Sequence, residues 1–337
     1  MITSTPVARW YWGEPGHRTD LVGEAVRRFV LALRALDRHR LGTPHLGRVT
    51  VCVPEPGHRD FLVRSDFQVG ALAVVDSGAP ESLTARIGAA LTPGEIGTVE
   101  LFATCDGIVE TGRDARAEEG LFTLSVEASE GFFNVGLTTY SDAWLPFDLR
   151  GHAQEALFAA NGPRLASALA EISEALDLEV DPDDSTWFAV PTETGAENQF
   201  EDTDGSPSDV WGRFEVPYRN TVFSQAPTFT PGYGRQASGP VRYVPVVGEQ
   251  GTLGYLWASD AESAASFEPC DVADLDGYRA GLLWLDRLQA SFDRGLAPAE
   301  ALNRLAASAE DSVAGRAASS ETAEVDEFWK LRELARS

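Results

Sequence analysis

The sequence predicts an α+β fold with two domains, each a mixed, mostly antiparallel sheet with helices packed on one side, and a helical tail at the C-terminus. Apolar residues make up 43% of the 337 residues, and eight Trp and seventeen Phe supply material for two hydrophobic cores. In each half, strand patterns come before helix patterns, an order that favours α+β layers over alternating βαβ units. We place the domains at 1–180 and 181–310, and a linker with a tail helix at 311–337.

After a predicted strand over 8–12, the first half carries an amphipathic helix over 20–38, in which apolar residues recur with the helical period, at Val22, Ala25, Phe29, Leu33 and Leu36. Alternating apolar and polar residues then predict strands over 48–53, 61–63, 71–75, 98–103, 121–127 and 132–140. A short helix follows Glu81. A helical segment over 153–160 is expected to pause at Asn161-Gly162 and to restart at Pro163, because proline is favoured in the first turn of a helix.

The second half begins with a predicted strand over 186–190 and a long loop region over 191–240, which is rich in Gly, Pro, Ser and Thr. Strands over 241–247 and 252–258 flank Gly248-Glu249-Gln250-Gly251, a hairpin signal. The helix predicted over 274–294 carries one apolar stripe, formed by Leu275, Tyr278, Leu282, Leu285, Leu288 and Phe292. A helix over 298–307, a polar linker over 308–322 and a tail helix over 325–334 complete the chain.

Charge is distributed unevenly along the chain. The formal net charge is −25, yet residues 1–50 carry eight Arg against four acids. Residues 151–204 carry thirteen Asp and Glu, opposed by Arg164 alone. A concentrated anionic field attracts cationic partners and repels nucleic acid and anionic membranes. We therefore expect a basic protein as the partner, and neither nucleic acid nor a membrane.

Composition argues against several chemistries. Of 27 basic residues 26 are Arg, and the single Lys330 lies near the end of the chain, so a P-loop, a kinase strand lysine and a pyridoxal Schiff base are disfavoured. Cys52, Cys105 and Cys270 are odd in number and far apart, which is atypical of a disulfide framework or a zinc site. We expect no cofactor, no catalysis and, without a visible signal peptide, a cytoplasmic location.

One five-residue segment occurs twice. Glu-Pro-Gly-His-Arg stands at 14–18 and again at 55–59, each time after a predicted strand. If the two turns met, they would offer Glu14, His17, Glu55 and His58 as a metal or acid–base site. The competing interpretation is a Pro-Gly turn used twice, with its polar side chains in solvent.

The 191–218 segment combines acids with aromatic residues, the composition of an interface that captures a basic partner. Its candidate partner-binding residues are Glu193, Glu197, Glu201, Asp202, Asp204, Asp209, Trp211, Phe214 and Tyr218. An inhibitor of a nucleic-acid-directed enzyme needs this profile, because it must occupy a cationic cleft made for phosphate. The competing interpretation is that the acids only confer solubility.

The sequence therefore favours a non-catalytic acidic binding protein. Its concrete form is an immunity or inhibitor protein that caps the active site of a basic toxin or enzyme. The first alternative is a metal-binding protein or enzyme that uses the two repeated turns. The second is a structural or assembly protein that docks on a partner through the tail helix.

Overall fold

The computed structural model describes residues 1–17, 19–57, 60–69, 78–112, 114–199, 207–225 and 232–336. It confirms the predicted α+β class: mostly antiparallel sheets are combined with helices, and a helix ends the chain. The strand expected at 71–75 and the candidate residues His58, Glu201, Asp202 and Asp204 lie outside the described residues. The chain divides into two compact units, Met1–Val210 (the N-terminal unit) and Trp211–Ser337 (the C-terminal unit).

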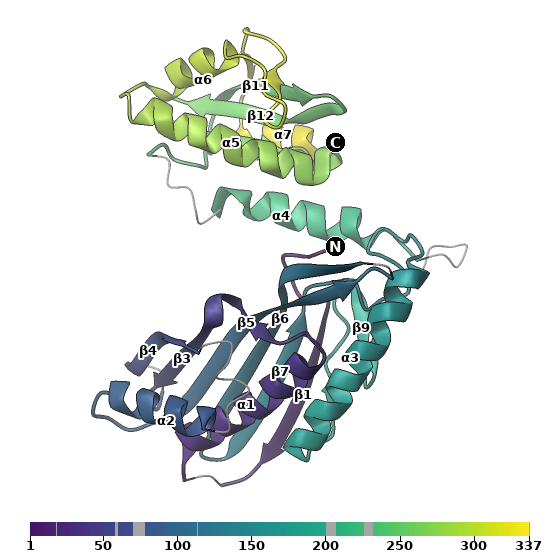
Figure 1. The fold of residues 1–337 in the computed structure, drawn as a ribbon. Coiled ribbons are helices and arrows are strands. Elements are labelled where there is room, and N and C mark those ends of the chain that lie inside the picture. The colour runs from purple at the N-terminus through teal and green to yellow at the C-terminus, as the bar shows by residue number, and fades with distance from the viewer. Residues whose placement is uncertain are drawn as a thin grey trace. The chain divides into compact units, whose positions relative to one another are not determined.

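The N-terminal unit is built on an eight-stranded antiparallel sheet with the strand order β4-β3-β5-β6-β7-β1-β8, in which β2 pairs with β5 (Figure 1). The strands are β1 (Ala8–Pro15), β2 (Thr43–Pro44), β3 (Arg48–Pro54), β4 (Phe61–Gln68), β5 (Thr98–Glu110), β6 (Ala115–Ser129), β7 (Phe132–Thr139) and β8 (Asp181–Pro182). Buried and exposed residues alternate along β5, as expected for a sheet with one face on the core.

Three helices accompany this sheet: α1 (Leu21–Arg38), α2 (Ala79–Ala90) and α3 (Glu155–Leu176). Asp20 caps α1 by accepting a hydrogen bond from the backbone N–H of Gly23 at 2.9 Å, and the predicted apolar stripe is buried. The helix α3 does not restart at Pro163, as the sequence suggested, but runs through it as one element. A two-stranded hairpin, β9 (Ala189–Thr192) and β10 (Gly195–Asn198), follows β8.

The unit boundary lies near residue 210, whereas the sequence suggested one near 180. The reason is that the segment after α3 is built onto β1. Trp10 and Tyr11 of β1 pair with Pro182 and Asp181 of β8. The indole N–H of Trp10 also donates to the carbonyl of Thr192 at 2.8 Å. These contacts make 181–198 part of the N-terminal unit.

The C-terminal unit is a five-stranded antiparallel sheet with the order β13-β12-β11-β14, in which β15 also pairs with β11. Its strands are β11 (Val241–Gly248), β12 (Gly251–Ser259), β13 (Ala264–Pro269), β14 (Arg316–Ala317) and β15 (Ala323–Val325). The β11–β12 hairpin lies where its Gly-rich turn predicted. The region expected as loop carries, in its described part, a π-helical turn (Trp211–Glu215) and α4 (Val216–Val222).

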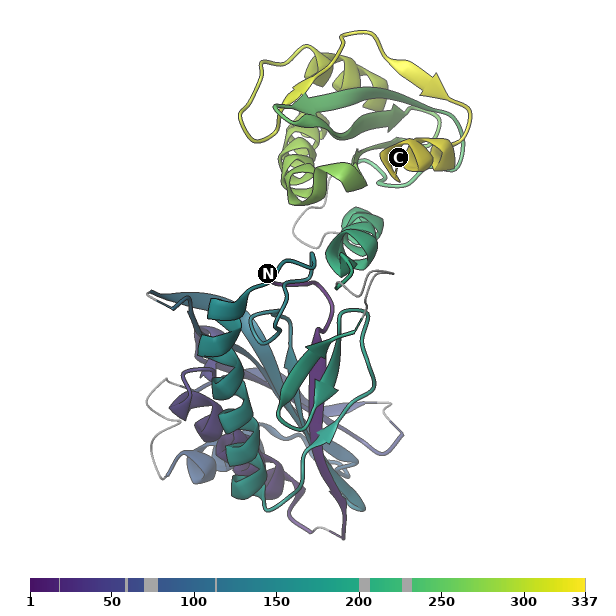
Figure 2. The ribbon, with the colours of Figure 1, turned by 90° about the vertical axis from the view of Figure 1, so that its right-hand side faces the viewer.

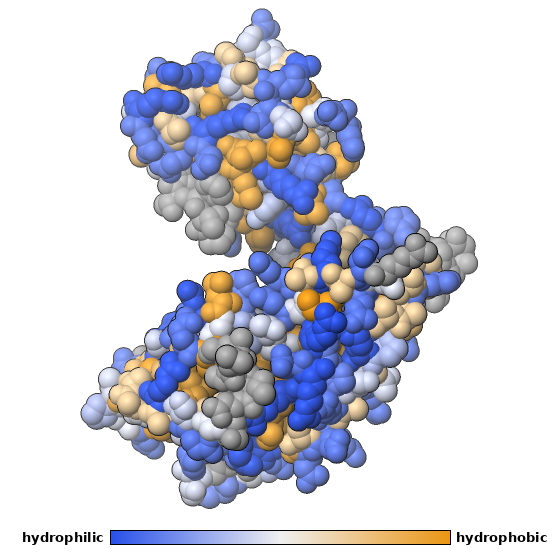
Figure 3. Space-filling view, viewed as in Figure 1, coloured by the Kyte–Doolittle hydropathy of each residue, from blue (hydrophilic) through white to orange (hydrophobic). Residues whose placement is uncertain are grey.

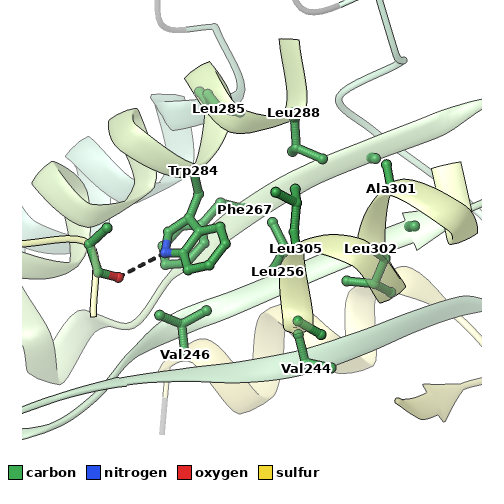
Figure 4. Packing of buried hydrophobic residues seen from close by; sticks show 14 of the residues in the cluster. Val244, Val246, Leu256, Phe267, Trp284, Leu285, Leu288, Ala301, Leu302 and Leu305 are labelled. Carbon is green, nitrogen blue, oxygen red and sulfur yellow. Dashed lines mark hydrogen bonds between the residues drawn. The ribbon is translucent and has the colours of Figure 1, made fainter. Parts of the chain in front are cut away.

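Helices cover both faces of this second sheet. The helices α5 (Asp274–Phe292) and α6 (Pro298–Ala306) pack on the face that presents Val244, Val246 and Leu256 (Figure 4). The tail helix α7 (Phe328–Arg336) packs on the opposite face, against Trp257. The indole N–H of Trp284 donates to the carbonyl of Ala314 at 2.8 Å, which ties α5 to the segment before β14.

The stripe predicted on α5 is partly confirmed. Leu285 and Leu288 are fully buried, and Leu282 is half-buried against the same cluster. Phe292 is exposed, whereas Trp284, which the stripe did not include, lies at the centre of the core.

We predict that Leu285→Ala lowers the free energy of unfolding of the C-terminal unit by about 2–5 kcal/mol, because it leaves a cavity under α5. The matched control is Leu283→Ala on the same helix, where the side chain is 36% exposed and the expected loss is below about 1 kcal/mol. Urea unfolding followed by circular dichroism measures both. Equal losses for the two variants would contradict this core.

A buried carboxylate lies under the tail helix. Oε1 of Glu268, on β13, lies 3.2 Å from Nε of Arg332 on α7. Burial raises the pKa of Glu268 to about 7, because the attraction of Arg332 and Arg336 offsets the loss of hydration only in part. In the unfolded chain this carboxyl has its ordinary pKa of 4.5.

Between pH 4.5 and pH 7, Glu268 keeps its proton in the folded state and has lost it in the unfolded state. The free energy of unfolding therefore falls as the pH rises through this range. We predict that raising the pH from 4.5 to 8 removes up to about 3 kcal/mol of stability through this group. Glu268→Gln should remove that part of the pH dependence, and Glu333→Gln, at an exposed site, should retain it. Urea unfolding of the three proteins across this range is the measurement, and parallel pH profiles would contradict the assignment.

Candidate functional site

The two units differ in charge. Residues 1–210 carry 34 Asp and Glu against 15 Arg, a net charge of −19, whereas residues 211–337 carry 18 acids against 12 basic residues. On the face of the N-terminal unit seen in Figure 3, hydrophilic residues cover most of the surface. The anionic field therefore belongs mainly to the N-terminal unit.

The arginines near the N-terminus are largely paired with acids in the fold. Arg28 Nε lies 2.8 Å from Glu24, and Arg38 of α1 pairs with Glu171 of α3. Burial alone would raise the pKa of Glu171, but hydrogen bonds from Arg38 and His39 lower it below its ordinary value. The basic start of the sequence thus provides ion pairs within α1 and between α1 and α3.

The acids that follow α3 have a different environment. Six of them are exposed, and none forms an ion pair with another described residue: Asp177, Glu179, Asp181, Asp184, Glu193 and Glu197. Asp183, half-buried among them, lies 3.5 Å from Arg9 of β1. These six carboxylates remain available to a partner, and we name them the acidic strip.

An exposed indole lies beside Asp184 of the acidic strip. Trp187 is 51% exposed, whereas the next residue, Phe188, is 1% exposed. A pocket of about 450 Å³ is lined by Trp187 and Phe188 together with Asp183, Asp184 and Arg9. Six of the eight Trp side chains are fully buried, so a half-exposed indole beside exposed carboxylates is unusual for this chain.

A turn around Thr186 determines which of the two aromatic rings is exposed. The hydroxyl of Thr186 donates to the carbonyl of Val7 at 2.7 Å and accepts from the backbone N–H groups of Phe188 and Ala189 at 3.0 and 3.1 Å. This side-chain turn holds the backbone against Val7, the residue that precedes β1. Phe188 consequently points into the core and Trp187 points outward.

The remaining predicted partner-binding residues are dispersed. Glu193 and Glu197 belong to the β9–β10 hairpin and Asp209 is exposed, all within the N-terminal unit. Phe214 and Tyr218 are half-buried in the C-terminal unit. The predicted partner-binding segment, 191–218, therefore belongs partly to the N-terminal unit and partly to the C-terminal unit.

Trp211, expected as the aromatic anchor, is a core residue. It is 1% exposed, its indole N–H donates to Asp274 Oδ1 at 2.9 Å, and the Arg219 guanidinium lies 5.3 Å from the ring centroid. Its ring has no free face to insert into a partner. Trp187 has the exposure expected of Trp211, and the sequence signal that could have found it is an indole directly after Asp183-Asp184-Ser185-Thr186.

The two repeated turns are separated by the topology of the sheet. β1 and β3 run in the same direction, so Glu14 and Glu55 at their C-terminal ends lie at one end of the sheet, but β7, β6 and β5 lie between them. Four strand spacings amount to about 19 Å. Glu14 faces Arg28 at 3.4 Å, and Nδ1 of His17 lies 3.4 Å from Glu130. Within the described ranges, no three His, Cys, Asp or Glu residues are grouped as metal ligands.

The tail helix uses its apolar face within the chain. Phe328 and Leu331 are buried, and the ring centroids of Phe328 and Trp257 lie 4.5 Å apart.

The three cysteines are buried as well, and loss of hydration raises the pKa of Cys105 to about 12 and of Cys270 to about 11. Thiols of that kind are poor nucleophiles.

The chain matches no family model, no curated protein and no solved structure. None of the helices in the described ranges has the length and apolar character that a membrane crossing requires.

We predict that Trp187 emission is quenched selectively by cations. In a Trp329→Phe background, which removes the other exposed indole, caesium should quench more strongly than iodide by at least about twofold, relative to N-acetyltryptophanamide in the same low-salt buffers. Adding Trp187→Phe should abolish the quenchable component. Equal relative quenching by the two ions would show that the acidic strip does not impose its potential on this indole.

Proposed function

We propose that this chain is a non-catalytic acidic binding protein that captures a basic protein, in the manner of an immunity or inhibitor protein that caps the active site of a basic toxin or enzyme. The observation that carries the proposal is the acidic strip beside the exposed ring of Trp187. The net charge of −19 on the N-terminal unit is consistent with this role.

Charge supplies the first stage of capture. Exposed carboxylates that are not consumed by internal ion pairs keep their full interaction with an approaching cation. Complementary fields raise the association rate by one to three orders of magnitude at low salt. The net charge of −19 on the N-terminal unit also disfavours nucleic acid, so the favoured target is a protein that itself presents a cationic surface.

Trp187 supplies the second stage. Tryptophan and arginine are the residues most enriched at the energetic centres of interfaces. An indole face also binds guanidinium and ammonium groups through the cation–π interaction. A ring held by the Thr186 turn loses little conformational entropy when a partner covers it, so Trp187 is suited to prolong a complex that charge has formed.

Inhibition follows when such a surface covers a cleft made for phosphate. Enzymes that act on nucleic acids concentrate Arg and Lys where the phosphates bind. Carboxylates can occupy those positions without being substrates. An acidic protein then blocks the cleft by binding alone, with no catalytic group of its own.

We predict that charge controls association and that Trp187 controls dissociation. The variant Asp181→Asn, Asp184→Asn, Glu193→Gln, Glu197→Gln should lower the association rate constant with the basic partner roughly tenfold at low salt and weaken its salt dependence. Trp187→Ala should raise the dissociation rate constant by roughly 10- to 100-fold. Binding kinetics at two salt concentrations measure both.

The matched control removes the same number of charges from exposed sites of the C-terminal unit, through Glu249→Gln, Asp286→Asn, Glu321→Gln and Glu333→Gln. Wild type, variant and control serve as baits against proteins of the source cell, including those it secretes. The proposal requires a basic protein that wild type and control retain, that the strip variant loses, and whose activity falls when wild type is added. Recovery of no such protein, or equal retention by all three baits, would refute it.

A further inference from the structure

A second pocket lies between α3 and the β9–β10 hairpin, which run side by side in the N-terminal unit (Figures 1 and 2). Its volume is about 340 Å³. Apolar groups form most of its wall, and they come from three places along the chain: Trp144 and Pro146, then Phe158, Ala159 and Gly162 of α3, and Ala196 of β10.

The walls of this pocket are held in place by hydrogen bonds. The Asn198 side chain of β10 accepts from the backbone N–H of Phe147 at 3.2 Å and donates to its carbonyl at 3.0 Å. Gln154 donates to the carbonyls of Asp142 and Leu145, which fixes the loop that carries Trp144. A preformed cavity of this kind loses little entropy when it is filled.

Small residues keep the cavity open on the helix side. A Cβ atom on Gly162 would lie 2.9 Å from the Phe158 ring, so glycine is what allows that ring to lie against the helix. Ala159, one helical turn earlier, is exposed and also lines the pocket. A larger side chain at Ala159 would occupy the space that these residues leave.

Among the residues that the structure describes, Glu197 is the one charged residue that lines the pocket. It is exposed and belongs to the acidic strip, so no described basic side chain neutralises it. A purely apolar ligand would take water from this carboxylate without replacing it, and an anion would be repelled. A long aliphatic stem with a terminal cation satisfies both the apolar walls and the carboxylate.

We infer that this pocket receives one arginine or lysine side chain of the basic partner, with the stem against Phe158 and Ala159 and the cation at Glu197. The inference rests on the proposed function, because it names a contact of the same capture surface. It adds a specificity that the field alone lacks, since a field selects charge and a pocket selects the position of one residue.

The test uses capped Gly-Arg-Gly as the probe. Capped Gly-citrulline-Gly, a neutral analogue of the same shape, is the reference, and capped Gly-Lys-Gly compares the two cations. Amide NMR spectra of the full chain should shift at Ala159, Gly162 and Ala196, with a dissociation constant on the order of 1 mM for the arginine peptide. The citrulline peptide should bind at least about fivefold more weakly.

Two single variants isolate the carboxylate. In Glu197→Gln the arginine and citrulline peptides should bind with about the same dissociation constant, so the preference for arginine is lost. It should persist in Glu193→Gln, which removes the same charge from the same hairpin but does not line the pocket. A preference that survives in Glu197→Gln, or shifts that lie elsewhere, would overturn the inference.

Two further variants test the cavity. Ala159→Leu should abolish the shifts, whereas Ala170→Leu, at an exposed position of the same helix outside the pocket, should leave them unchanged. Capture of the basic partner by these variants then distinguishes the pocket inference from the proposed function. If the four-charge variant weakens capture of the partner and Ala159→Leu does not, the pocket inference fails and the proposed function stands. If neither change affects capture, both fail.

Discussion

Strand β1 is the element on which the arrangement of the N-terminal unit depends. One edge pairs with β7, and the other pairs with β8, the strand that begins the acidic segment. The indole N–H of Trp10 also donates a hydrogen bond to the carbonyl of Thr192 in the β9–β10 hairpin. These contacts turn a polar stretch, which would otherwise be a linker, into a fixed surface. Without them neither Trp187 nor Glu197 would have a defined environment.

The charges of the chain fall into two groups with different physical roles. Arginines of α1 face acids of the same unit, and the pair of Arg38 with Glu171 connects α1 to α3. The acidic strip has no ion-pair partner among the described residues, and its carboxylates are exposed to solvent. Unpaired like charges repel one another and lower the stability of the folded state somewhat. The acidic strip therefore does not add to the stability of the fold.

Local patterns in the sequence predicted the helices α1 and α5 and the β11–β12 hairpin, because periodicity and turn residues act over a few positions. The unit boundary could not be predicted in this way. Asp181-Pro182-Asp183-Asp184 has the composition of a linker, and its pairing with β1 depends on residues about 170 positions away. For the same reason the sequence pointed to Trp211 as the anchor. Both Trp187 and Trp211 lie among acids, and only tertiary contacts, Thr186 with Val7 and Trp211 with Asp274, decide which ring is exposed.

The pairing of β1 with β8 also sets an order of events during synthesis. The strand made first must wait until α3 and the following segment have left the ribosome before its second edge is covered, and contacts this distant in sequence form slowly. Until then the arginines of α1 lack Glu171, and the strip acids do not yet lie on a sheet. The basic segment 1–50 is therefore synthesised before the acidic segment 151–204. The exposed acids of this segment take up their final positions only after residues 181–192 have folded onto β1.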